Sequence, residues 1–258
     1  MECAMLTQFT REFWTQCVKK DGHRPDGRSL LEYRNIGLNT GTLSHCEGSA
    51  LVKLGSCIVL CGVKSELLKP IEGLDKPKTV VLTAYHHDKT TNLLYTEHLS
   101  KLFQQSTVLD CDQLWLVPDQ WCWVLYVDCV SLTPSMSLDA CILATTAALQ
   151  NTQLPTVSIN NDNIPVVTTN NRQYITLSSA PVAVTIARIN DEMVADPSHE
   201  ELEICDGTVC IISNNKDDFS ELNTISVSGP IGDHDDVKKC LQAAPKLLLT
   251  IRTLLTSV

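Results

Sequence analysis

The N-terminal third of the chain shows a helical apolar stripe, followed by short apolar runs that glycines interrupt. Apolar positions at roughly helical spacing predict a helix over residues 6–18. The members of this stripe are Leu6, Phe9, Phe13 and Val18. Between residues 35 and 65 the apolar runs are separated by single glycines at Gly48 and Gly55. This part of the sequence therefore predicts a β-meander with a turn at each glycine.

The middle of the chain predicts a helix, a buried strand and a second helix. Residues 66–92 are polar and contain prolines, so we expect irregular structure there, followed by a helix over residues 95–109. The run WCWVLYVDCVSL at 121–132 is too apolar for an edge strand and predicts a buried one. The small apolar residues that follow predict a helix over 137–149 wedged tightly against a sheet. Further strands are predicted at about 156–160, 173–177 and 181–188.

The last part of the chain is acidic and then helical. Residues 191–221 contain ten acidic residues and one lysine. Residues 233–258 carry a helical stripe, and Pro245 is expected to kink that helix. The stripe consists of Val237, Leu241, Ala244, Leu248, Ile251 and Leu255. Strands, a central helix, more strands and a final helix together predict an α+β fold.

The composition is that of a folded protein of 258 residues, with 43% hydrophobic and 19% charged residues. Its longest apolar runs are far too short to span a bilayer. The N-terminal segment lacks the basic-then-apolar layout of a secretory signal, so we expect an intracellular protein.

Twelve cysteines raise the question of disulfides or zinc. Six of them lie inside apolar segments, which predicts small core residues in a reducing compartment. These six are Cys57, Cys61, Cys129, Cys141, Cys205 and Cys210. The alternative is a zinc site at the pairs 57/61 and 205/210, but both pairs fall in strand-like runs without an adjacent histidine. We therefore expect no metal.

The charge balance argues against a free-standing RNA binder. Twenty basic against thirty acidic residues give a net charge of −10, whereas such proteins carry a basic patch. Any RNA contact must be local, or shared with more basic partners.

Three collinear segments resemble the ribonuclease PH family. The first comprises RPDGR (Arg24–Arg28), EGSALVKLG (Glu47–Gly55) and CGVKSE (Cys61–Glu66); the second is VLYVDCVSL with SLDACILATTAALQNTQLP; the third is MVADPSHEELEICDGTVCIISN (Met193–Asn214). The resemblance covers about residues 20–65 and 95–258. It implies the ribonuclease PH fold, a ribosomal protein S5 domain 2-like arrangement of mixed sheets packed with helices. The implied division is a domain 1 at 1–190 and a C-terminal subdomain at 191–258.

Within the family the pattern resembles non-catalytic ring subunits of the eukaryotic RNA exosome. Active members attack RNA 3′ ends with phosphate, and carry Thr-Arg-Thr before the buried helix. The corresponding residues here are Ser137, Leu138 and Asp139, so a charge-assisted phosphate contact is lost and Asp139 would repel phosphate. The family's catalytic aspartates correspond to Leu202 and Thr208. No catalytic residue is therefore expected, unless an alignment slip brings Glu201, Glu203 or Asp206 into place.

Four cations are candidates for RNA contacts: Arg24, Arg28, Lys53 and Lys64. The two arginines flank a Pro-Asp-Gly turn, which favours a structural role, pairing with Asp26 or with an adjoining subunit. The lysines are equally compatible with solvent-facing strand positions. Residues 67–94 are shorter than in relatives, with HHDKTT in place of an arginine-rich turn, so the resemblance carries no RNA contact to that segment.

Two acidic features suggest metal binding but have simpler interpretations. Asp196, Glu200, Glu201, Glu203 and Asp206 resemble a magnesium site, yet a solvated acidic turn or a face meeting a basic neighbour is the commoner case. His86-His87-Asp88 resembles a ligand set, but has no further ligand at a telling distance, which favours an exposed polar loop.

The resemblance implies an architectural function. Six ribonuclease PH-like subunits would form a hetero-hexameric ring, capped by S1 or KH subunits and served by an associated hydrolytic ribonuclease. This chain would line the RNA channel in 3′-to-5′ RNA processing (rRNA maturation, mRNA decay), in the nucleus, nucleolus and cytoplasm, without a cofactor or a membrane. One alternative is an active phosphate-dependent exoribonuclease, and the residue at position 138 distinguishes it from a non-catalytic subunit. The other is a free-standing interaction protein, which would not co-purify with the other ring subunits.

Overall fold

The computed structural model describes residues 2–70, 79–104, 108–117, 120–160, 164–214, 224–229 and 234–256. The chain divides into two compact units. The terminal unit comprises residues 1–35, 182–213 and 218–253, and the central unit comprises residues 36–181, 214–217 and 254–258. Within the described residues, no helix is both long and apolar enough to span a bilayer.

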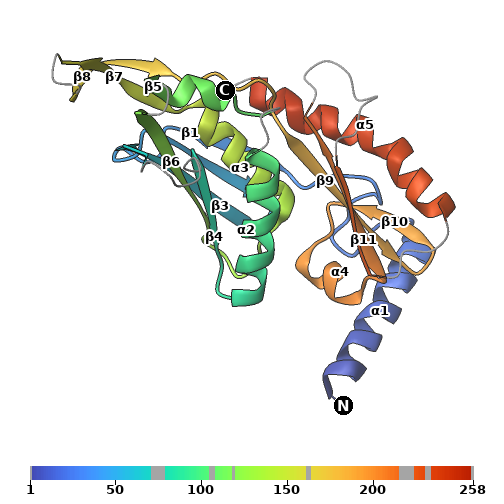
Figure 1. Ribbon diagram of the computed structural model, residues 1–258. Coiled ribbons are helices and arrows are strands. Elements are labelled where there is room, and N and C mark those ends of the chain that lie inside the picture. The colour runs from blue at the N-terminus through green and yellow to red at the C-terminus, as the bar shows by residue number, and fades with distance from the viewer. Residues whose placement is uncertain are drawn as a thin grey trace. The chain divides into compact units, whose positions relative to one another are not determined.

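The central unit is built on a six-stranded sheet (Figure 1). Its strands are β1 (Ile36–Thr40), β2 (Gly48–Leu54), β3 (Cys57–Leu68), β4 (Val80–Tyr85), β5 (Trp115–Val117) and β6 (Trp121–Ser131). They follow the order β1-β2-β3-β6-β4, with β5 also pairing with β6. The neighbours along this path are antiparallel except β4 and β6, which are parallel. The helix α2 (Lys89–Phe103) connects β4 with the short 3-10 helix η1 (Cys111–Leu114), which precedes β5.

The helix α3 (Leu138–Gln150) forms the core of the central unit, because it packs on β2 and β3 and every residue from Asp139 to Leu149 is buried. Small side chains allow this close approach. The buried thiols of Cys61 and Cys129 lie opposite each other on β3 and β6. The hydrogen bond with Cys129, together with burial, raises the pKa of Cys61 well above its ordinary value, so the thiol stays neutral. After α3, the strands β7 (Gln153–Ile159) and β8 (Pro165–Tyr174) form a separate ribbon.

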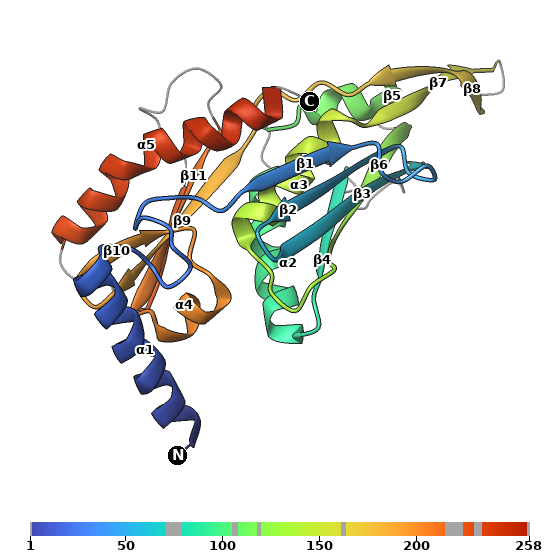
Figure 2. The same cartoon turned by 180° about the vertical axis from the view of Figure 1, so that it is seen from behind.

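The terminal unit is an antiparallel sheet with helices (Figure 2). Its elements are α1 (Glu2–Asp21), β9 (Val182–Ile189), β10 (Glu192–Ala195), α4 (His199–Ile204), β11 (Gly207–Ser213), β12 (Thr224–Ser228) and α5 (His234–Thr256), except that residues 254–256 at the end of α5 belong to the central unit. The strand order is β10-β9-β11-β12. Trp14 of α1 packs with Ile189, Val194 and Ile204, which attaches the first helix to this sheet.

The helix predicted at residues 6–18 is confirmed within α1, but the side of the helix that packs is different. Phe9 and Phe13 are 70% and 53% exposed, whereas Trp14 is buried and Val18 packs beside it. The side chain of Leu6 lies outside the described residues. The apolar spacing correctly predicted a helix, but which of its side chains are buried depends on the side of α1 that packs on the sheet.

Residues 66–92 were wrongly predicted to be irregular. The strand β3 extends to Leu68, VVLTAY forms β4, and α2 begins at Lys89. The helix predicted at 95–109 therefore lies about one and a half turns earlier, although Leu99, Leu102 and Phe103 are buried as expected. Residues 71–78 and 105–107 lie outside the described part of this region. The strand β4 is buried because it pairs in parallel with β6, and the polar segments on either side of β4 gave no sign of this pairing in the sequence.

The meander, the buried strand, the central helix and the final helix are confirmed as β1–β3, β6, α3 and α5. Only one of the two predicted glycine turns exists: Gly55 has a φ of +59°, whereas Gly48 is the first residue of β2. Of the six cysteines predicted to be core residues, only Cys205 is not fully buried.

Candidate functional site

The start of α3 is the position that the resemblance assigns to phosphate. Ser137 is the N-cap, with extended backbone and no capping hydrogen bond from its side chain. Leu138 is the first helical residue, and the buried Asp139 follows in the first turn. A helix N-terminus attracts anions through its free N–H groups and dipole. Here an aliphatic and an acidic side chain occupy that end.

The turn before α3 is held by groups of the central unit. The Tyr95 hydroxyl donates to the Met136 carbonyl at 3.3 Å, and the His86 Nε2 lies 2.6 Å from the Pro134 carbonyl oxygen. Asp88 caps α2 by accepting from the backbone N–H groups of Thr90 and Thr91. The structure thus places His86-His87-Asp88 in a capping loop.

The positions that the resemblance assigns to the catalytic aspartates carry no carboxylate. Leu202 is 39% exposed on α4, and Thr208 is paired on β11. Of the neighbouring carboxylates, Asp206 accepts from Arg11 at 2.6 Å, and Glu203 lies 3.7 Å from His199 on the surface.

Glu201 belongs to a cluster that we call the arginine cluster: Arg24, Asp196 and Glu201, which are buried, with Arg28 and Arg34, which are half-buried. Arg24 donates from Nε to Glu201 Oε1 at 2.8 Å and from Nη2 to Glu201 Oε2, and its side chain is 0% exposed. Its Nη1 donates to the Ala195 carbonyl at 2.9 Å. Trp14 Nε1 donates to the same Glu201 carboxylate at 3.0 Å. Arg24 therefore ties the N-terminal segment to the strand–helix region around α4.

Asp196 is the second anion of the arginine cluster. Arg34 donates to it from Nη2 at 2.6 Å and from Nε at 2.8 Å, and Arg28 lies 3.2 Å away. The fork geometry of a guanidinium suits such bidentate pairing. The expected pairing of Arg28 with Asp26 is also present, at 2.7 Å.

The arginine cluster corrects one interpretation of the sequence and supports another. Asp196 and Glu201 are buried, so this part of the acidic segment is not a solvated turn. The guanidinium of Arg24 has no exposed surface, which leaves it no access to RNA in this conformation and favours its structural role. No sequence signal linked Arg34 or Trp14 to residues more than 160 positions away.

The electrostatics of Glu201 depend on these partners. Burial alone would raise the pKa of this carboxyl, but hydrogen bonds from Arg24, Ser198 N–H and Trp14, with the Arg24 charge, lower it below its ordinary value. Glu201 is therefore ionised at neutral pH, as its pairing with Arg24 requires.

Lys53 and Lys64 are exposed on β2 and β3. The strand register places both lysines on the same face of the sheet, with Asp128 of β6 also on that face. Burial raises the pKa of Asp128, and the charge of Lys64 opposes that shift. The RNA contact stays a prediction for both lysines.

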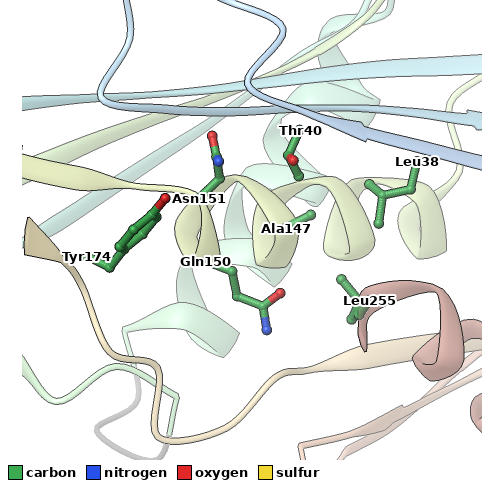
Figure 3. Close-up of a pocket in the computed structure, with 7 residues that line it drawn as sticks. All are labelled: Leu38, Thr40, Ala147, Gln150, Asn151, Tyr174 and Leu255. Atoms are coloured by element: carbon green, nitrogen blue, oxygen red, sulfur yellow. The ribbon is translucent and has the colours of Figure 1, made fainter. Parts of the chain in front are cut away.

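A cavity of about 280 Å³ lies at the other end of α3 (Figure 3). It is lined mainly by Leu38, Thr40, Gln150, Asn151, Tyr174 and Leu255. All of these side chains are uncharged. This cavity could not be predicted from the sequence, because its residues come from separate strands and helices and form no motif.

Comparison with known proteins gave consistent matches. The models of the 3′ exoribonuclease family match residues 32–155 (domain 1) and 179–246 (domain 2). Exosome complex component Rrp42 of Sulfurisphaera tokodaii is 32% identical over 197 residues, covering 72% of each chain. Its counterpart from Pyrococcus horikoshii is 30% identical over 216 residues, covering 76% of each.

Solved structures show the same fold. A chain of an archaeal exosome core has a TM-score of 0.82 at 23% identity, covering 99% of this chain and 100% of that one. A chain of the Archaeoglobus fulgidus exosome with RNA bound to the active site has a TM-score of 0.80 at 24% identity, covering 96% and 98%. The predicted α+β ribonuclease PH fold is confirmed.

Proposed function

Because the chain belongs to the 3′ exoribonuclease family, which includes exosome component Rrp42, we propose that it is a ring subunit of an RNA exosome without catalytic activity. Its role is to build the ring and line the RNA channel. We assign it to the eukaryotic complex, as the subunit resembling exosome component eight.

The observation that carries the proposed lack of activity is the start of α3. Phosphorolysis requires a bound phosphate, and a site for it needs cationic side chains or unobstructed N–H donors. The Leu138 side chain supplies no cation, and Asp139 places a carboxyl group in the same helical turn as the N–H donors of the helix start. A carboxylate in that turn repels a phosphate ion bound at the helix start.

The acidic segment supports the same proposal. Two of the carboxylates near the lost catalytic positions have structural partners, since Glu201 pairs with Arg24 and Asp206 with Arg11. A carboxylate held by a guanidinium is a poor general acid, because the pairing stabilises its ionised form.

The partners follow from a ring architecture. A closed ring requires two heterologous interfaces per subunit, each burying on the order of 800 Å² per partner. With a net charge of −10, this chain suits neighbours that are more basic. We propose that they are other ribonuclease PH-like subunits, S1 or KH cap subunits and a hydrolytic ribonuclease, acting in the nucleus, nucleolus and cytoplasm.

The absence of activity is tested with the purified full chain, inorganic phosphate and RNA with a single-stranded 3′ tail. We expect no release of nucleoside diphosphate, while an active ribonuclease PH assayed in parallel shortens the tail. Nucleoside diphosphate release that disappears in the Glu203→Gln variant would contradict the proposal, because Glu203 is an exposed carboxylate of the acidic segment.

The assembly is tested by isolating the tagged chain from nuclear, nucleolar and cytoplasmic fractions of its own cells. Native mass spectrometry should show a complex that contains six ribonuclease PH-like subunits, with cap subunits and a ribonuclease. A monomer in every fraction would instead identify a free-standing protein that kept the fold.

A further inference from the structure

The cavity at the C-terminal end of α3 has the chemistry of a site for a flat, neutral ligand. The residue Tyr174 is 64% exposed although it lines the cavity. Figure 3 shows this ring beside the last turn of α3, with the Gln150 side chain extending from the helix. Leu38 and Leu255 form aliphatic walls at the end of the cavity opposite Tyr174. An exposed ring next to aliphatic walls offers a surface on which a planar group can stack.

The polar groups of the cavity have unused hydrogen-bonding capacity. Neither the Gln150 carboxamide nor the Tyr174 and Thr40 hydroxyls have a hydrogen-bond partner within the described part of the chain. Asn151 differs, because its Oδ1 accepts from the Ser49 backbone N–H at 3.4 Å. Gln150 is therefore the carboxamide that can offer both a donor and an acceptor to a ligand.

Electrostatics oppose a phosphate in this cavity. Its lining has no charged side chain, and the C-terminal end of a helix carries partial negative charge from the helix dipole. A ligand with amino donors suits that end better than an anion does. A nucleobase without its phosphate meets this requirement.

We propose that this cavity binds one unpaired adenine base, which stacks on Tyr174 and pairs with the Gln150 carboxamide. Adenine presents an acceptor at N7 beside a donor at N6, and a glutamine side chain matches both. This inference rests on the proposed function, in which RNA passes along the ring. It also shows how an acidic chain can hold RNA, by its bases and not by its phosphates.

The direct test measures binding of adenosine and uridine, neither of which carries phosphate, to the full-length chain by NMR titration. Adenosine should bind more tightly than uridine, with an affinity unchanged between about 50 and 200 mM salt, because no ion pair forms. Tyr174→Ala should weaken adenosine binding about tenfold through lost stacking. Gln150→Glu removes the donor to N7, and should reduce the preference for adenosine over uridine by about tenfold.

The control is Tyr85→Ala, which removes another exposed tyrosine of the central unit. Tyr85 lies on β4, at the opposite edge of the sheet from β1, where Leu38 and Thr40 lie. This variant should bind adenosine as the unchanged chain does. Equal binding of adenosine by Tyr174→Ala, or equal binding of the two nucleosides by the unchanged chain, would overturn the inference.

A second experiment separates this inference from the proposed function. RNA carrying 8-azidoadenine is cross-linked to the assembled complex, and the cross-link is expected at Tyr174. A complex that assembles but has Tyr174 covered by a neighbouring subunit overturns the adenine site and leaves the ring role intact. A chain that binds adenosine but joins no ring would support the adenine site and contradict the ring role.

Discussion

Replacing Glu201 with glutamine is expected to lower the free energy of unfolding by about 3–5 kcal/mol, because it leaves the buried Arg24 guanidinium without its counter-charge. Arg24 and Glu201 have side chains that are 0% and 6% exposed, so water cannot replace the lost partner. Glutamine keeps the shape of the side chain, and the loss is therefore one of charge and hydrogen bonding rather than packing. Urea unfolding at neutral pH measures the change.

Acid should reduce the difference in free energy of unfolding between the unchanged chain and Glu201→Gln. The pKa of Glu201 is lowered in the folded protein, so its contribution is fully present above its unfolded pKa of about 4.5. As the pH falls through the lower folded value, Glu201 becomes protonated and that contribution disappears. The gap between the unchanged chain and Glu201→Gln should therefore narrow below about pH 4.5.

The matched control is Glu203→Gln on the same short helix. Its carboxylate is exposed and lies 3.7 Å from His199, so the change should be less than about 1 kcal/mol. Equal losses for Glu201→Gln and Glu203→Gln would show that the arginine cluster does not stabilise the fold.

Replacing Gly48 with alanine is expected to destabilise the chain by about 3 kcal/mol, at the upper end of the usual cost of overpacking. A Cβ at this position would lie 2.5 Å from the Ala148 carbonyl oxygen and 2.7 Å from Thr152 Cα, and would also clash with the Thr152 hydroxyl. Because two of these atoms belong to the backbone, rotamer changes cannot relieve the clash. The end of α3 would have to move away from β2.

Gly37→Ala provides the comparison on the neighbouring strand. A Cβ there meets Lys53 Cβ at 3.8 Å, an ordinary contact, so the free energy of unfolding should stay within about 0.5 kcal/mol of the original. Thermal unfolding of both variants measures the difference. A Gly48→Ala protein as stable as Gly37→Ala would mean that α3 does not press on β2 as the structure shows.

Local pattern was sufficient for the elements whose burial is uniform. The run at 121–132 and the small apolar residues of 137–149 identified β6 and α3 nearly to the residue, because both are buried on most sides. The pattern failed at β4, which is bounded by polar segments and gains its burial from pairing with β6. It also failed at Phe9 and Phe13, whose apolar spacing does not reveal which side of α1 meets the sheet.

The sequence by itself determined which side chain stands at residue 138, and an aliphatic leucine side chain offers no charge-assisted contact to phosphate. It also determined the fold class and the family, through segments that lie in the family's order. Only the tertiary structure decided which charged side chains pair with each other and which of them are buried. Arg24 and Glu201 are 177 residues apart and pair because folding brings both into a place that water cannot enter. Tyr174 and Gln150 likewise line one cavity only after β8 and α3 are in place.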